Sequence, residues 1–174
     1  MTAHSYNDIV VRRAVQADIP LLVEFNAAMA RETEERSLNL ETLEAGIQGV
    51  FEDPSRGFYL VGEIPQEQTY PVLGGQLLIT YEWSDWRNGN FWWIQSVYVH
   101  QNWRKQGIFR ALYRYVLTQA QARADVCGVR LYVEKNNALA QTVYAKMGLH
   151  ATSYRFLERD FVLSAKLVDS KDTP

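Results

Sequence analysis

The chain has 174 residues, a formal net charge of −2, 47% apolar and 22% charged residues, and a single cysteine. This length fits one domain with a real core, which we expect to span residues 1–174, and no apolar run is long enough to cross a bilayer. The charge gives no electrostatic reason to expect a nucleic-acid partner, one cysteine excludes an internal disulfide, and no His, Cys or carboxylate cluster has metal-ligand spacing.

The first eight residues, Met1 to Asp8, lack the basic and apolar regions of a secretory signal. We therefore expect a cytoplasmic protein. Among its partners we expect neither a membrane nor a nucleic acid, and we expect no metal cofactor.

The first hundred residues are predicted to contain four strands and two helices. Asp18 and Pro20 open the first helix, and Asn39 is placed to cap a second helix that runs to about Val50. Turn-forming residues predict a turn over 65–71 and a loop over 82–90. The predicted strands are residues 9–12, 58–64, 72–81 and 91–99.

The remainder of the chain begins with a long amphipathic helix. This helix is expected from about residue 105 to 125, followed by a strand over 129–134 and a helix over 137–147. Two closing strands are predicted near residues 150–157 and 161–167. Strand hairpins followed by a strand–helix–strand unit favour an α+β sandwich on a mixed sheet.

The stretch from Val97 to Leu112 has the shape of an anion cradle, because an apolar strand runs through a short basic turn into a helix. Backbone N–H groups of such a turn and the positive end of the helix, about half an elementary charge, suit a phosphate or pyrophosphate. Gly107 has no side chain and lets the backbone approach a ligand closely.

A second motif follows about thirty residues later, where Asn137, Ala140 and Tyr144 precede the pair Gly148-Leu149. The turn Arg104-Lys105-Gln106-Gly107-Ile108-Phe109 and this second motif resemble the two signatures of the GNAT superfamily of acyl-CoA-dependent N-acetyltransferases. Those signatures are Gln/Arg-x-x-Gly-x-Gly/Ala and Asn-x-x-Ala-x-x-x-Tyr. The resemblance implies a GNAT-like α/β/α sandwich on a mixed, mostly antiparallel central sheet. It also implies acetyl-CoA as cosubstrate and a homodimer.

The resemblance further assigns a cofactor role to each segment. Asn137 would touch the cofactor near its thioester end, and Tyr144 would protonate the leaving thiolate, at an uphill cost of only ~2 kcal/mol for pKa values of ~10 and ~8.5. The backbone that would pair with the pantetheine arm belongs to Val97, Tyr98 and Val99. The residues that would hold the pyrophosphate are Arg104, Lys105, Gln106, Gly107, Ile108 and Phe109.

Phe109 departs from the family signature, which has glycine or alanine at this position. We interpret its ring as packing outward or into the core while its N–H still serves the phosphate. The alternative is weakened or altered cofactor binding.

The group that deprotonates the amine is not defined by these motifs. Gln95 stands where many relatives carry a glutamate and cannot usefully accept a proton. The segment Thr80-Tyr81-Glu82-Trp83 resembles the acidic-aromatic segment of the diamine and polyamine acetyltransferases, which makes Glu82 the first candidate base. Water and the weaker candidates Asp85, Glu32 and Glu35 remain open. The candidate substrate-binding residues are Tyr81, Glu82, Trp83 and Gln95.

The segment from Tyr81 to Trp93 is unusually rich in aromatic residues. Its rings could hold an organic cation, or they could pack against a second subunit. The expected activity is direct transfer of an acetyl group to a primary amine of a small molecule: a diamine, a polyamine or an amino-acid-like compound. The alternatives are a protein lysine or N-terminal acetyltransferase, and a noncatalytic acyl-CoA-binding module.

Overall fold

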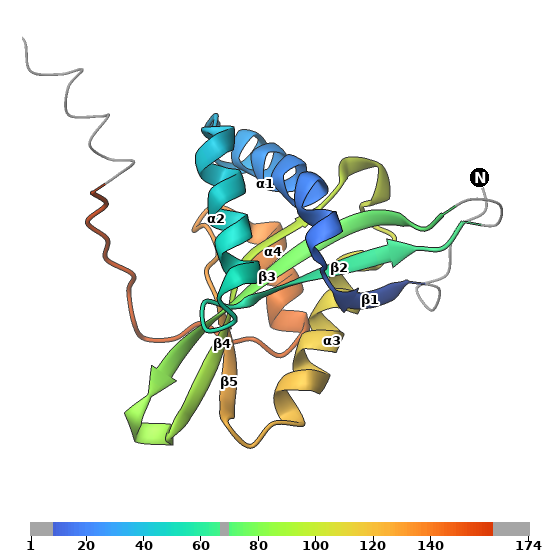
Figure 1. The fold of residues 1–174 in the computed structure, drawn as a ribbon. Coiled ribbons are helices and arrows are strands. Elements are labelled where there is room, and N and C mark those ends of the chain that lie inside the picture. Colours follow the sequence, from blue (N-terminus) through green and yellow to red (C-terminus); the bar gives the residue numbers. More distant parts are fainter. Residues whose placement is uncertain (1–8, 67–69, 162–174) are drawn as a thin grey trace, which may run out of the picture. The chain divides into compact units, whose positions relative to one another are not determined.

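A five-stranded sheet in the order β1-β2-β3-β4-β5 forms the centre of the computed structural model, which describes residues 9–66 and 70–161 (Figure 1). The first three neighbouring pairs are antiparallel, and β4 and β5 are parallel. The expected mixed, mostly antiparallel sheet is therefore confirmed. The strands are β1 (Val10–Arg13), β2 (Phe58–Ile64), β3 (Val72–Ser84), β4 (Gly89–Val99) and β5 (Val126–Leu131).

The described part of the chain contains four α-helices. Pro20 lies in the first turn of the first helix, where its missing N–H costs nothing. The side chain of Asn39 accepts a hydrogen bond from the Thr42 N–H at 2.8 Å, so the predicted cap of the second helix is confirmed. The helices are α1 (Ile19–Glu34), α2 (Leu40–Glu52), α3 (Ile108–Gln121) and α4 (Ala138–Lys146).

The chain divides into two compact units, Met1–Val133 and Glu134–Pro174. The first unit contains the sheet, α1, α2 and α3, and the second contains α4. A single domain over residues 1–174 stays a prediction.

Helices cover both faces of the sheet within the first unit (Figure 1). On one face, Ile19 and Leu22 of α1 and Ile47 of α2 form a buried cluster with Tyr59 and Val61 of β2. On the other face lies α3, where Ile108 packs directly over glycines of β2 and β3. A Cβ added to Gly62 or Gly75 would lie 3.1 Å from the side chain of Ile108. Glycines here let α3 pack close to the strands. The expected α/β/α sandwich is thus observed.

The predicted loop over 82–90 is wrong, because β3 and β4 continue as a hairpin to the pair Ser84 and Gly89. A single 3-10 turn, Asp85–Arg87, joins the strands, and Asn88 follows it in the left-handed conformation at φ 47°. Aromatic residues favour strands, and cross-strand pairing extends the ladder past the point where the sequence becomes polar.

Two further boundaries differ from the prediction. The helix expected from residue 105 begins at Ile108, since Gln101–Trp103 form a 3-10 turn and Gly107, at φ 91°, is the N-cap. The strand expected over 129–134 lies at Val126–Leu131, because its ladder begins where Asn90 of β4 pairs with Val126.

The closing strand expected over 150–157 is also wrong. These residues are all described and none of them lies in a strand. Alternating apolar residues produce a strand only where a neighbour supplies ladder hydrogen bonds, and the apolar side chains of Tyr154, Phe156 and Leu157 are exposed instead. The second closing strand, 161–167, lies outside the described residues except for Phe161.

We expect Leu112→Ala to lower the free energy of unfolding by about 2–5 kcal/mol, because the side chain of Leu112 is fully buried between α3 and the sheet. Urea denaturation measures the change. Leu40→Ala is the matched control: Leu40 is 57% exposed in the first turn of α2, and its loss should change the value by about 0.5 kcal/mol or less. Equal effects of the two substitutions would contradict the observed packing of α3.

Candidate active site

The sheet opens between β4 and β5. The parallel ladder runs from Asn90 and Val126 to Ile94 and Leu131, and β4 then continues to Val99 with no described strand pairing on that side. Gln95 lies at this point as a β-bulge, because Ser96 pairs with Leu78 and Ile94 pairs with Ile79 of β3. The last part of β4 therefore presents a backbone edge to which an extended ligand can hydrogen-bond.

The turn between β4 and α3 has the backbone expected of an anion cradle. Lys105 at φ 63° and Gly107 at φ 91° are both in the left-handed region, and they bring the chain into α3 at Ile108. A glycine N-cap has no side chain that could occupy the space in front of the first helical amides. These features fit the pyrophosphate of an acyl-CoA, since a helix N-terminus favours an anion.

Phe109 does not need to turn into this cradle. Its half-buried ring stacks on that of Tyr113, one turn further along α3, with ring centroids 6.1 Å apart. The aromatic side chain thus has a packing partner on its own helix. This placement fits our interpretation of the ring, and the role of the Phe109 N–H towards the phosphate stays a prediction.

The side chain of Arg104, first residue of the predicted turn, is bonded to the protein itself. Its Nε donates to the carbonyl of Val99 at 3.0 Å, and its Nη2 forms an ion pair with Glu32 in α1. Tyr98 of β4 donates its hydroxyl to the same carboxylate at 2.7 Å. The hydrogen bond from Arg104, followed by that from Tyr98, lowers the pKa of Glu32, which makes Glu32 a weak base.

Glu82 is likewise paired. Its carboxylate accepts hydrogen bonds from the indole N–H of Trp93 and, at 2.7 Å, from Arg130 of β5. Partial burial opposes the ionisation of Glu82, but these two hydrogen bonds together with the charge of Arg130 outweigh it and lower its pKa. The ring of Tyr132 stacks on Trp93 with centroids 4.4 Å apart.

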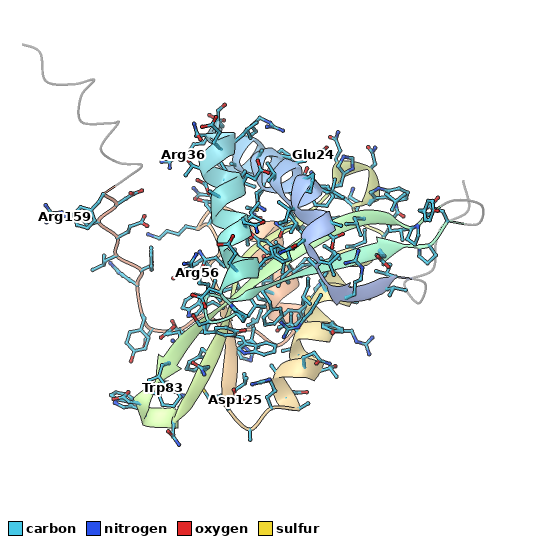
Figure 2. The ribbon with its side chains drawn as sticks, in the orientation of Figure 1. Glu24, Arg36, Arg56, Trp83, Asp125 and Arg159 are labelled. Atoms are coloured by element: carbon cyan, nitrogen blue, oxygen red, sulfur yellow. The ribbon has the colours of Figure 1, made fainter. Side chains whose placement is uncertain are left out.

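The structure does not gather all four predicted substrate residues on one face. Side chains alternate along a strand, so Tyr81 and Trp83 point to the face opposite Glu82. Tyr81 packs against Phe58, with ring centroids 6.3 Å apart, and Trp83 is 59% exposed near the end of the hairpin (Figure 2). Gln95 is exposed at the bulge, where its amide oxygen lies 3.5 Å from the hydroxyl of Thr80.

The residues of the second motif begin and end α4 in the second unit. Asn137 is the N-cap, and its side-chain oxygen accepts from the Ala140 N–H at 3.0 Å. Gly148, at φ 87°, ends the helix, and the Leu149 N–H donates to the carbonyl of Tyr144 at 3.0 Å. Burial raises the pKa of the Tyr144 phenol. The spacing of this motif is thus also the spacing of a capped helix.

Sequence reasoning missed two pairings in the first unit. It assigned no role to Arg130, and it considered Glu32 only as a weak candidate base, without its contact to Arg104. These pairs are 48 and 72 residues apart in the sequence. No local pattern marks them, because strand register and helix packing bring the partners together.

No group of His, Cys, Asp or Glu side chains in the described ranges could hold a metal ion. None of the helices formed by those residues has the length and apolar character needed to cross a membrane.

Comparison with known proteins identifies the family. The profile of the acetyltransferase (GNAT) family matches residues 22–149. This chain belongs to the GNAT acetyltransferase family. Family membership implies acyl transfer with acetyl-CoA as cosubstrate, and the open edge of β4 with its adjoining turn fits that cosubstrate.

Solved structures show the same fold. The crystal structure of "a possible acetyltransferase from Clostridium difficile 630" is 36% identical at a TM-score of 0.80, covering 88% of this chain and 98% of that chain. An aminoglycoside acetyltransferase from an uncultured soil metagenomic sample, solved with sisomicin, is 16% identical at a TM-score of 0.65, covering 88% and 97%. A transcriptional regulator from Bacillus halodurans C-125 is 20% identical at a TM-score of 0.69, covering 88% and 99%. No curated protein matches this chain significantly.

We expect Arg130→Gln to raise the pKa of Glu82 towards its ordinary value, because it removes a hydrogen bond and a positive charge from the carboxylate. A carbon-13 NMR titration of the Glu82 carboxyl measures the shift. Arg87→Gln, which removes the arginine from the turn between β3 and β4, is the control and should leave this pKa unchanged. An unaltered pKa in Arg130→Gln would show that the ion pair does not form in solution.

The same pairing predicts how stability depends on pH. The pKa of Glu82 is lower in the folded protein than its value of 4.5 in the absence of structure, so its contribution is complete above that value and is lost as the pH falls through the folded pKa. The difference in unfolding free energy between the unmodified protein and Glu82→Gln should therefore shrink from pH 7 to about pH 3. Urea denaturation at both pH values measures it, and a constant difference would contradict the prediction.

Proposed function

We propose that this protein is an acetyl-CoA-dependent N-acetyltransferase that transfers the acetyl group directly to a primary amine of a small molecule. The observation that carries the proposal is the continuous path from the open edge of β4, past Ile94, into the glycine-capped turn before α3. A flexible thioester arm and a pyrophosphate, linked in one ligand, match these two adjacent features.

The directions of the backbone N–H and C=O groups of β4 indicate how the pantetheine arm of acetyl-CoA would bind. The carbonyl of Tyr98 points towards Gly75 of β3, and that of Val99 accepts from Arg104. Because successive carbonyls of a strand point in opposite directions, the N–H and C=O of Val97 face the open edge. Val97 is therefore our main backbone partner for the pantetheine amides, and the turn from Arg104 to Phe109 is assigned to the pyrophosphate.

The amine must lose a proton before it attacks the thioester carbon. For an amine with a pKa of ~10.4, being neutral at pH 7 costs ~4.6 kcal/mol. Glu82 lies on the same face of β3 as the half-buried Leu78, which packs against the cluster formed by α1, α2 and β2. Its lowered pKa suits Glu82 to hold an ammonium group as a carboxylate. We therefore assign proton removal to water, with Glu82 orienting the amine.

Tyr144 is assigned the opposite proton transfer. When the carbon–sulfur bond breaks, the leaving thiolate takes the phenolic proton, which prevents the reverse attack. Burial raises the pKa of Tyr144, so the phenol is fully protonated at neutral pH before the reaction. The same shift increases the cost of donation, which makes close contact with the sulfur essential.

Other features support the finer parts of the proposal. The aminoglycoside acetyltransferase among the structural neighbours indicates that this fold accommodates a small-molecule acceptor. Trp83 and Trp86, at 59% and 85% exposure on the hairpin end, support a homodimer because exposed tryptophan is enriched at interfaces. The free thiol of Cys127 fits the reducing cytoplasm.

Tyr144→Phe should lower turnover by roughly 10²- to 10⁴-fold and leave the affinity for acetyl-CoA nearly unchanged, because it removes only the donated proton. Steady-state kinetics and calorimetric titration with acetyl-CoA separate the two effects. Tyr154→Phe, at an exposed tyrosine of the same unit, is the control and should match the unmodified enzyme. If acetyl-CoA binding collapsed in Tyr144→Phe, the phenol would be structural and not catalytic.

The proposed reaction is tested by calorimetric titration with acetyl-CoA, followed by measurement of thiol release with small amines, polyamines, amino acids, aminoglycosides and lysine peptides. We expect binding, and release with one class of small amine. Release only with the peptides would make the protein a protein acetyltransferase. Binding without any release would favour a noncatalytic acyl-CoA-binding module, and failure to bind would overturn the proposal.

A further inference from the structure

The arginine of the phosphate turn does not extend towards the space in front of α3. The Arg104 guanidinium is bonded to the Val99 carbonyl and to the Glu32 carboxylate, and it lies 5.6 Å from the centroid of the Tyr98 ring. All three partners belong to the protein. The side chain thus ties the turn back onto β4 and α1.

Glu32 is held firmly enough to act as the anchor of this connection. It lies in the last turn of α1 and accepts the hydroxyl of Tyr98 at 2.7 Å. Tyr98 is buried, and its ring packs against Phe25 of α1 with centroids 5.5 Å apart. The Glu32 carboxylate therefore connects the core of the first unit to the turn.

Two further side-chain contacts of the turn join residues close together in the sequence. The side chain of Gln106 donates to the Asn102 carbonyl at 3.2 Å, and the Asn102 N–H lies 3.4 Å from the ring nitrogen of His100. Both contacts are local and exposed, and the turn includes Lys105 in the left-handed region. The ion pair with α1 is a long-range contact that can fix the turn before a ligand arrives.

An exposed ion pair of this kind contributes little to global stability. Its effect should instead appear as preorganisation, since a ligand binds more weakly when it must first order the segment that holds it. The affinity for a ligand of the turn is thus the quantity that depends on Glu32.

We propose that Glu32 is a positioning residue for the acyl-CoA turn: through Arg104 it holds the turn in shape, so that backbone groups and not the guanidinium face the pyrophosphate. The inference deepens the proposed function and rests on it. It assigns to the end of α1 a role in cofactor binding that no sequence motif marks.

The affinity of Glu32→Gln for acetyl-CoA distinguishes this positioning role from direct phosphate binding by Arg104. Glu32→Gln releases the guanidinium from its ion pair. If Glu32 positions the turn, acetyl-CoA should bind about 3- to 30-fold more weakly. If Arg104 were a phosphate ligand restrained by Glu32, acetyl-CoA would bind more tightly, and that result would overturn the proposal, as would unchanged binding.

Calorimetric titration with acetyl-CoA measures the affinities, and thermal melting confirms that each variant is folded. The double variant Glu32→Gln/Arg104→Gln should bind no more weakly than Arg104→Gln alone, because the two residues act through one contact. Additive losses would contradict this. Glu34→Gln is the matched control, since it removes an exposed carboxylate from the same turn of α1.

Hydrogen exchange of the protein without cofactor gives a second readout. The amides of residues 101–107 should exchange faster in Glu32→Gln than in the unmodified protein and in Glu34→Gln, and unchanged exchange would refute the positioning role. This readout does not depend on acetyl-CoA. If the unmodified protein failed to bind acetyl-CoA, the proposed function would be wrong. Hydrogen exchange would still show whether Glu32 orders the turn.

Discussion

The parting of β4 from β5 is the constraint on which the rest of the site depends. A parallel pair cannot be joined by a tight turn, so the chain must leave β4, cross one face of the sheet as α3 and return as β5. The bulge at Gln95 ends the shared ladder early, while β4 runs on to Val99. The crossover therefore makes an open backbone edge and a helix N-terminus neighbours, and our proposal assigns both to one long ligand.

The two candidate-site carboxylates of the first unit, Glu32 and Glu82, each form an ion pair with an arginine. Glu32 is paired with Arg104 and Glu82 with Arg130, and each has a lowered pKa. A carboxylate in this state is a poor proton acceptor, but it remains a good hydrogen-bond acceptor. In our proposals such a carboxylate sets geometry, on the cofactor side for Glu32 and on the acceptor side for Glu82, and water removes the proton from the amine.

Elements that are stabilised by residues close together in the sequence were predicted correctly, and elements that depend on distant partners were not. The strand over 58–64 and the cap at Asn39 were predicted correctly, because their signals lie within a few adjacent residues. Two predictions were wrong: much of the expected loop over 82–90 is strand, and the expected strand over 150–157 is not a strand. In the first case cross-strand pairs extended a ladder into a polar stretch, and in the second an apolar pattern found no strand to pair with.

The sequence by itself determined the family, through the turn around Gly107 and the helix capped by Asn137. Those motifs are local: glycine conformation and helix caps depend on residues within one or two turns. Only the tertiary structure decided that Glu82 meets Arg130 and that Glu32 meets Arg104, 48 and 72 residues away. Such pairs depend on strand register, on the bulge in β4 and on the packing of α1, none of which has a signal in adjacent residues.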